Sequence, residues 1–228
     1  MKLKKNYKIT IAADGSAASG KTTGSKKIAK KFGFKFLSSG ILYRYASYLL
    51  INKKPKNRIV FLKNSFKKLN LNRLNKIKLH TPEISEYTSV IAKENKIRNI
   101  LKKFQKNFAK KYNKVCIEGR DIGTVILPNA DIKFFFKCDL STAAKRRFKE
   151  LKKNNKNINL VNIKKSLKIR NNRDKTRKNS PLLASPDAII VDTGKLNNVP
   201  DMINKMSKIV LKKVKEKYGS WSTNKKSI

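Results

Sequence analysis

The sequence predicts an α/β protein with a parallel β-sheet core flanked by helices, and three observations support this. Short apolar runs alternate with longer segments of helical periodicity along the 228 residues, a pattern typical of parallel sheets. The first apolar run, residues 7–13, leads into a glycine-containing loop and then a helix. A later run, residues 115–119, ends at a glycine that is followed by Arg120 and Asp121. Open parallel sheets bind ligands at such carboxyl ends.

The loop after the first strand matches the pattern G-x-x-x-x-G-K-[ST]. Its residues are Gly15, Ser16, Ala17, Ala18, Ser19, Gly20, Lys21, Thr22 and Thr23. The glycines let backbone N–H groups converge, and the helix predicted over residues 25–32 adds partial positive charge at its start. We expect Lys21, on an exposed loop, to reach the β- and γ-phosphates of a nucleoside triphosphate, and Thr22 to bind Mg²⁺. The alternative is a Gly/Ser-rich turn that binds nothing. The pattern predicts a P-loop NTPase without specifying its reaction.

The remaining elements follow from apolar periodicity and from residues that end helices. Gly33 is expected to stop the first helix, and Ser38–Gly40 to form a turn with a helix N-cap. Further strands are predicted over 34–37, 115–119, 132–136 and 188–192, and helices over 41–51, 57–69, 96–112, 140–151, 163–177 and 200–218, with another beginning at Pro82. Residues 71–80 are expected to be irregular or a small β piece, and residues 152–162 a loop.

The charge of the chain is extreme. It contains 57 Lys and Arg against 14 Asp and Glu, a formal net charge of +43. Such a field attracts nucleic acid and other polyanions without sequence preference. The lysines do not gather in one segment, so a general bias of composition is the alternative explanation. Both interpretations stay open, and anionic nucleotide substrates fit either.

The cysteines and the apolar runs indicate in which cellular compartment the protein is expected. Cys116 lies in an apolar stretch and Cys138 just after one, without a C-x-x-C pattern, so we expect buried reduced thiols and a cytoplasmic protein. The single His80 is expected in a solvated loop. No apolar run approaches the ~20 residues of a membrane span, and a signal peptide is not expected. We expect a monomer that does not bind membranes.

Arginines gather where the rest of the chain uses lysine. Arg170, Arg173, Asp174 and Arg177 fall at i, i+3, i+4 and i+7, on one face of a predicted helix. A single aspartate cannot neutralise three guanidinium groups, and an anion between them would relieve their repulsion. Arginine binds phosphate through planar bidentate contacts, whereas lysine offers a point charge. The face therefore indicates a phosphate site, with a solvated basic helix as the alternative.

Four segments together resemble the bacterial cytidylate kinases, over about residues 9–196. They are IAADGSAASGKT (11–22), SSGILYR (38–44), EGRDIGTVILPNA (118–130) and RNNRDKTR (170–177). The G-R-D-x-G-T-V block is the most specific of them. The resemblance implies a core (1–41, 113–144 and 183–228), a monophosphate-binding arm (42–112) and a lid (145–182). The implied reaction is ATP with CMP or dCMP, giving ADP with CDP or dCDP, and Mg²⁺ as cofactor.

The resemblance also implies roles for individual residues. The loop from Gly15 to Thr23, with Arg146 from the lid, would bind ATP. The residues that would bind CMP are Ser39, Arg44, Ser89, Arg98, Arg120, Asp121, Arg170, Asp174 and Arg177. Among these, Ser89, Arg98 and Asp121 would read the cytosine; the alternative for Asp121 is that it merely pairs with neighbouring arginines. Those implied in catalysis are Lys21, Arg120, Arg146 and Arg177.

The chain departs from the family pattern in two places that affect the site. Ser38-Ser39-Gly40 replaces the usual Asp-Ser-Gly, and Ala18 replaces a glycine inside the phosphate loop. The alanine is acceptable only if its φ stays negative.

No general base is evident, and none is needed if a phosphate oxygen is the acceptor. Alternatives are a UMP or AMP kinase on the same frame, or a basic RNA-binding protein that keeps a P-loop.

Overall fold

A computed structural model describes residues 2–152, 158–196 and 198–219. Its contacts divide the chain into two units, one formed by Met1–Leu37 with Tyr112–Ile228 and the other by Ser38–Lys111. The helices of the expected lid belong to the first unit in this division. The division into core, arm and lid stays a prediction.

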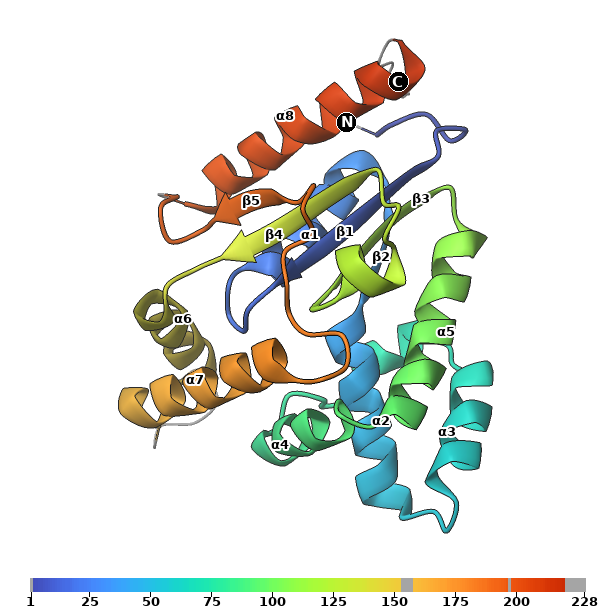
Figure 1. Cartoon of the computed structure of the whole chain (residues 1–228), viewed down its shortest axis with the longest axis vertical. Coiled ribbons are helices and arrows are strands. Elements are labelled where there is room, and N and C mark those ends of the chain that lie inside the picture. The colour runs from blue at the N-terminus through green and yellow to red at the C-terminus, as the bar shows by residue number, and fades with distance from the viewer. Residues whose placement is uncertain (1, 153–157, 197, 220–228) are drawn as a thin grey trace. The chain divides into compact units, whose positions relative to one another are not determined.

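The first unit is built on a five-stranded sheet with the strand order β2-β3-β1-β4-β5 (Figure 1). The strands are β1 (Ile9–Gly15), β2 (Lys35–Ser38), β3 (Lys114–Gly119), β4 (Ile132–Lys137) and β5 (Ile189–Asp192). The pairs β1–β3, β1–β4 and β4–β5 are parallel. Because β1 is central, its carboxyl end lies between those of two neighbours, with Asp14 opposite Gly119 and Phe135. The predicted sheet and fold class are confirmed.

Two helices, α1 (Lys21–Phe32) and α8 (Val199–Tyr218), pack against each other and against the sheet. Their apolar faces meet strand residues in one cluster, which includes Ile28, Phe32, Phe134, Met206 and Val210. Gly33 ends α1 with φ 76°, and its N–H donates to Ala29 O. The predicted stop is confirmed, since a residue in the left-handed region suits glycine. This packing holds the start of α1, and with it the phosphate loop, at the carboxyl edge of the sheet.

Two further helices of the first unit, α6 (Leu140–Lys152) and α7 (Leu160–Thr176), follow β4 and pack on each other. Both were predicted from the sequence, and α7 begins three residues earlier than expected. Of the loop expected over 152–162, residues 153–157 lie outside the described residues. A π-helical turn, η2 (Ile122–Ile126), was not expected.

The second unit is helical. It contains α2 (Ser39–Lys53), α3 (Arg58–Lys67), a 3₁₀ helix η1 (Leu71–Lys76), α4 (Pro82–Ile91) and α5 (Asn95–Lys111). Ser38 caps α2 by accepting from the Ile41 N–H at 3.4 Å, so the rest of the turn expected at 38–40 already belongs to the helix. The segment 71–80 contains the 3₁₀ helix instead of a β piece, because Asn70 caps it by accepting from the Asn72 N–H.

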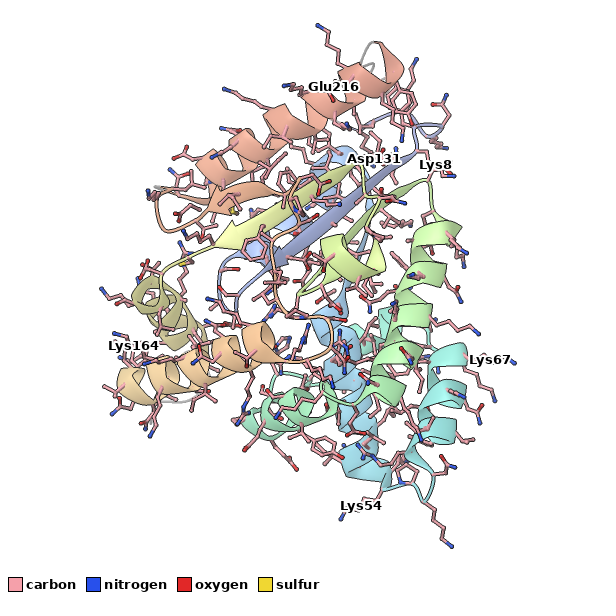
Figure 2. All side chains as sticks on the ribbon, in the orientation of Figure 1. Lys8, Lys54, Lys67, Asp131, Lys164 and Glu216 are labelled. Atoms are coloured by element: carbon pink, nitrogen blue, oxygen red, sulfur yellow. The ribbon has the colours of Figure 1, made fainter. Side chains whose placement is uncertain are left out.

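Lysine side chains are exposed on helices and loops of both units, as Lys8, Lys54, Lys67 and Lys164 illustrate in Figure 2. Within the described ranges, every helix is too short or too polar to span a membrane. Both cysteines are free thiols, but only Cys116 is buried. The burial expected of Cys138 was wrong, because it lies just past the end of β4, where the chain leaves the sheet. His80 is exposed in a loop, as predicted.

Candidate active site

The phosphate loop joins β1 to α1 in a conformation that its glycines make possible. A Cβ atom on Gly15 would lie 2.4 Å from the backbone oxygen of Phe136, so no side chain fits there. Gly20 adopts φ 79°, in the left-handed region. Within the turn, the Ser19 hydroxyl donates to Ser16 O at 3.0 Å. The loop therefore turns tightly against the end of β4.

Ala18 also lies in the left-handed region, with φ 56°. The negative φ that was required for this alanine to be acceptable is therefore not found. The tight turn between the two glycines imposes this conformation although an alanine Cβ disfavours it. Ala18 packs at the edge of a small apolar cluster with Ala17, Ala143 and Leu167.

Lys21 is the first residue of α1, and only 7% of it is exposed. The expectation of an exposed loop position was wrong, because the loop folds over the side chain. The Nζ atom lies 3.4 Å from Ser16 O and 3.8 Å from a carboxylate oxygen of Glu118, which is itself buried on β3. Burial lowers the pKa of Lys21 to about 7; the charge of Arg120 lowers it further, and Glu118 opposes the shift. Sequence reasoning did not select Glu118, although it directly precedes the G-R-D-x-G-T-V block.

Two helices of the first unit reach the phosphate loop. The Ala17 N–H donates to the side-chain oxygen of Asn171, on α7, at 3.1 Å. Arg146, on α6, lies beside the loop as well: its Nη1 is 3.9 Å from where a Cβ on Gly20 would stand. Sequence reasoning missed Asn171, although it lies in the RNNRDKTR segment, because only the charged residues of that segment were considered.

Arg146 is held by the residue that follows β5. Its Nη1 donates to the Thr193 hydroxyl and its Nη2 to the Thr193 backbone oxygen, each at 2.8 Å. The same hydroxyl donates to Ser19 O at 3.0 Å, so Thr193 connects α6 to the phosphate loop. Sequence reasoning missed Thr193 too. Its place directly after the carboxyl end of a predicted strand was the signal that could have found it.

The arginine face of α7 meets the segment after β3. Arg120 Nε donates to a carboxylate oxygen of Asp174 at 2.8 Å. Arg177 lies 3.7 Å from the other oxygen of Asp174 and 3.8 Å from Asp121. Burial alone would raise the pKa of Asp174, but Arg120, Arg170 and Arg177 outweigh it and hold that pKa below its usual range. The structure thus brings together five of the predicted site residues.

This network corrects two expectations about the arginine face. We expected a single aspartate to leave it unbalanced, but Asp121 adds a second carboxylate against Arg177. Arg173 is exposed, because it lies at the edge of the face, about 60° around the helix from Arg170. The contact of Asp121 with Arg177 matches the alternative interpretation of Asp121. Its role in reading a base stays a proposal.

Of the nine residues predicted to bind CMP, the other four belong to the second unit. Ser39 is buried at the start of α2. Arg44 is buried as well, and its Nη1 donates to Leu79 O at 3.1 Å and to the Ser85 hydroxyl at 2.7 Å. Ser89 donates to Ser85 O at 3.3 Å. Arg98 lies on α5, where its Nη1 donates to Ala92 O at 3.1 Å and its guanidinium stands 5.9 Å from the centre of the Tyr43 ring.

The residues fit a magnesium ion that is bound mainly by a nucleotide. Thr22 is exposed in the first turn of α1, next to Lys21. Among the described residues, no three His, Cys, Asp or Glu side chains gather closely enough to hold a metal ion. Magnesium in nucleotide sites keeps several waters and phosphate oxygens and needs few protein ligands. One threonine hydroxyl beside a phosphate loop meets that need.

A phosphate loop at the carboxyl edge of a parallel sheet, with a buried lysine and converging arginines, defines a P-loop protein built to bind phosphorylated nucleotides. A solved structure, TT1252 from Thermus thermophilus, shares the fold: its TM-score is 0.50 at 14% identity, over 92% of this chain and 99% of that one. A protein from Eubacterium ventriosum reaches the same TM-score at 19% identity, over 89% and 98%.

Sequence comparison defines the family. The cytidylate kinase family model matches residues 11–212. The cytidylate kinase of Bartonella tribocorum is 40% identical over 83% of this chain and 88% of its own length. That of Thermosipho melanesiensis is 35% identical over 90% and 98%. This chain therefore belongs to the cytidylate kinase family of nucleoside monophosphate kinases, and the resemblance found in the motifs is confirmed.

Proposed function

We propose that this protein transfers the γ-phosphoryl group of ATP to CMP and dCMP, giving ADP with CDP or dCDP. The observation that carries the proposal is the first unit's combination of a phosphate loop with the network of Arg120, Asp174 and Arg177. The loop fits a triphosphate, and the arginines fit a second phosphate. Family membership supports CMP as the acceptor.

On the donor side, the backbone of the phosphate loop and Lys21 bind the β- and γ-phosphates. Lys21 is already held near the loop by Ser16 O, so little side-chain freedom is lost on binding. Arg146 lies next to the loop and is held by Thr193, so it can approach the same phosphates. Thr22 would hold a Mg²⁺ ion, which would supply charge neutralisation on the transferred group.

On the acceptor side, Arg120 and Arg177 bind the phosphate of CMP. One of its oxygens attacks the γ-phosphorus; the bond to the bridging oxygen breaks, and ADP leaves with the electron pair. The attacking oxygen already carries charge, so no base is needed, and positioning with charge neutralisation supplies the catalysis. Arg170 and Asp174 are proposed for the ribose hydroxyl groups. The family resemblance adds Ser39, Arg44, Ser89 and Arg98 to the residues proposed for CMP.

We also propose that the protein acts in the cytoplasm, as a monomer, in pyrimidine nucleotide metabolism. Free thiols support this compartment, since both cysteines are unpaired and reducing conditions keep them so. A measurement of mass in solution by light scattering tests the monomer, and a dimer would contradict it.

The test of the reaction is ADP production from ATP and Mg²⁺ with CMP, dCMP, UMP and AMP in turn. We expect turnover with CMP and dCMP about a hundredfold or more faster than with UMP or AMP, because a wrong base leaves hydrogen-bonding groups unpaired. Turnover that prefers UMP or AMP would replace CMP by that acceptor. ADP production that no acceptor stimulates would refute the phosphotransferase proposal.

A further inference from the structure

A buried carboxylate, Asp14, lies at the end of β1 and has no role in the function proposed above. Only 3% of it is exposed, and the next residue opens the phosphate loop. One of its oxygens accepts from the Ile122 N–H at 2.8 Å, and the other accepts from the Gly123 N–H at 2.7 Å. The two oxygens of one side chain therefore bind two consecutive backbone groups that are distant in the sequence.

These two backbone groups open the π-helical turn η2, directly after Arg120 and Asp121. The first N–H groups of a helical turn have no acceptor within it. Asp14 supplies these acceptors, while Asp121 O accepts from the N–H groups later in the turn. A Cβ on Gly123 would lie 3.3 Å from Asp14 Oδ2 and 3.3 Å from Lys133 Cδ, so the turn sits tightly between them. Asp14 thus determines where the segment after β3 begins its turn.

The contact needs a carboxylate. Asparagine has one acceptor atom, and serine or threonine has one oxygen, whereas an ionised aspartate accepts on both oxygens. Burial raises the pKa of Asp14 to about 6, with Asp121 adding to the rise; the two N–H groups and Arg120 oppose it. A buried charge is costly to keep, and here two short hydrogen bonds from backbone N–H groups compensate for it.

We propose that Asp14 is a positioning residue for phosphoryl transfer, which aligns Arg120 with the phosphate loop. One side chain connects the strand that ends in the donor loop to the segment that carries the acceptor arginine. The inference rests on the proposed function, because it assigns those two segments to the two phosphates. The role is geometric: Asp14 touches neither nucleotide and exchanges no proton in the reaction.

The first test compares Asp14→Asn with a matched control at the other end of β1. Asp131 accepts from the Thr10 N–H at 2.8 Å and the Thr10 hydroxyl at 3.0 Å, and Figure 2 shows it near Lys8, before the start of the strand. We expect Asp14→Asn to lower kcat for CMP at least tenfold while the Kd for ATP changes less than threefold. Asp131→Asn should leave kcat within twofold, whatever it does to the melting temperature. Equal kcat in Asp14→Asn and wild type, or an equal loss in both variants, would overturn the proposal.

The second test asks whether Asp14 acts through Arg120. When two residues act through one another, the effects of their substitutions are not additive. Adding Asp14→Asn to the Arg120→Ala variant should therefore lower kcat/KM less than threefold below that of Arg120→Ala alone. Losses that multiply, or a tenfold rise in the Kd for ATP, would show that Asp14 acts elsewhere and overturn the proposal.

A third variant covers the case in which Asp14→Asn does not fold. Gly123→Ala presses on the same contact from the other side, and we expect the same loss of kcat with ATP binding preserved. Full activity in Gly123→Ala would contradict the proposal. A wild type without phosphoryl transfer would overturn the proposed function, and this inference with it, whereas an active wild type with an unaffected Asp14→Asn overturns this inference alone.

Discussion

Replacing Lys21 by methionine should abolish phosphoryl transfer and stabilise the fold. The side chain is buried, and its pKa is lowered from 10.5 to about 7, first of all by burial. Folding therefore favours the neutral amine, so stability rises with pH between 7 and 10.5, and the charged form is the costly one. The difference between these two pKa values corresponds to about 5 kcal/mol of destabilisation below pH 7. Methionine matches the stem of lysine and removes this cost.

The gain in the free energy of unfolding will be smaller than that figure, because the Glu118 carboxylate loses the Lys21 ammonium group that lies 3.8 Å from it. A buried charge without its partner costs about 3–5 kcal/mol when the pair was strong, and less at this distance. We expect a net stabilisation of about 1–3 kcal/mol at pH 6.5. For a chain of this size that is roughly 2–12 °C in melting temperature.

The assay is thermal and urea unfolding of wild type and Lys21→Met between pH 6.5 and 9.5, beside ADP production at pH 7.5. The advantage of the variant should shrink as pH rises, because the wild-type lysine becomes neutral in the folded state. Activity should fall by roughly a thousandfold or more, since the lysine is best matched to charge in the transition state. A variant less stable than wild type by the same amount at every pH would refute the buried-charge reasoning. Retained turnover would refute the donor role.

Three further predictions concern base choice, motion and charge. Asp121→Ala should lower kcat/KM for CMP at least tenfold and reduce the ratio of kcat/KM for CMP to that for UMP. An equal loss of kcat/KM with CMP and UMP would show that Asp121 only pairs with Arg177, which lies 3.8 Å from it. Hydrogen exchange over residues 160–180 should slow when a bisubstrate analogue binds, because bound nucleotides close such lids; unchanged exchange would count against a lid there. The charge of +43 should give weak RNA binding that falls steeply with salt and ignores sequence, and a salt-insensitive, sequence-selective complex in a filter-binding assay would contradict this.

Local patterns were enough to predict the order of elements and the loop proposed to bind phosphate. Apolar periodicity predicted the strands β3 and β4 and the helices α6 and α8, because the side chains that each element buries recur along the sequence in a recognisable pattern. Gly33 could be assigned as a helix stop because a left-handed residue is a local requirement. Differences arose at element ends, as in α1, which begins at Lys21 and thus earlier than residue 25. There the hydrogen bonds of the loop, not periodicity, decide where the helix starts.

The phosphate loop and the arginine-rich segments could be predicted from the sequence, since each is set by residues within one or two turns of one another. The α/β class could be predicted because strand and helix patterns alternate along the chain. The partners of single polar residues could not, because they come from distant parts of the chain. Asp14 meets Ile122, Ala17 meets Asn171, and Ser19 meets Thr193, at separations of 108, 154 and 174 residues. The first and the third contact follow from the strand order, which places the carboxyl ends of β3, β1, β4 and β5 along one edge of the sheet; the second depends on where α7 packs. Only in that arrangement do the burial of Lys21 and the pairing of Arg120 with Asp174 arise.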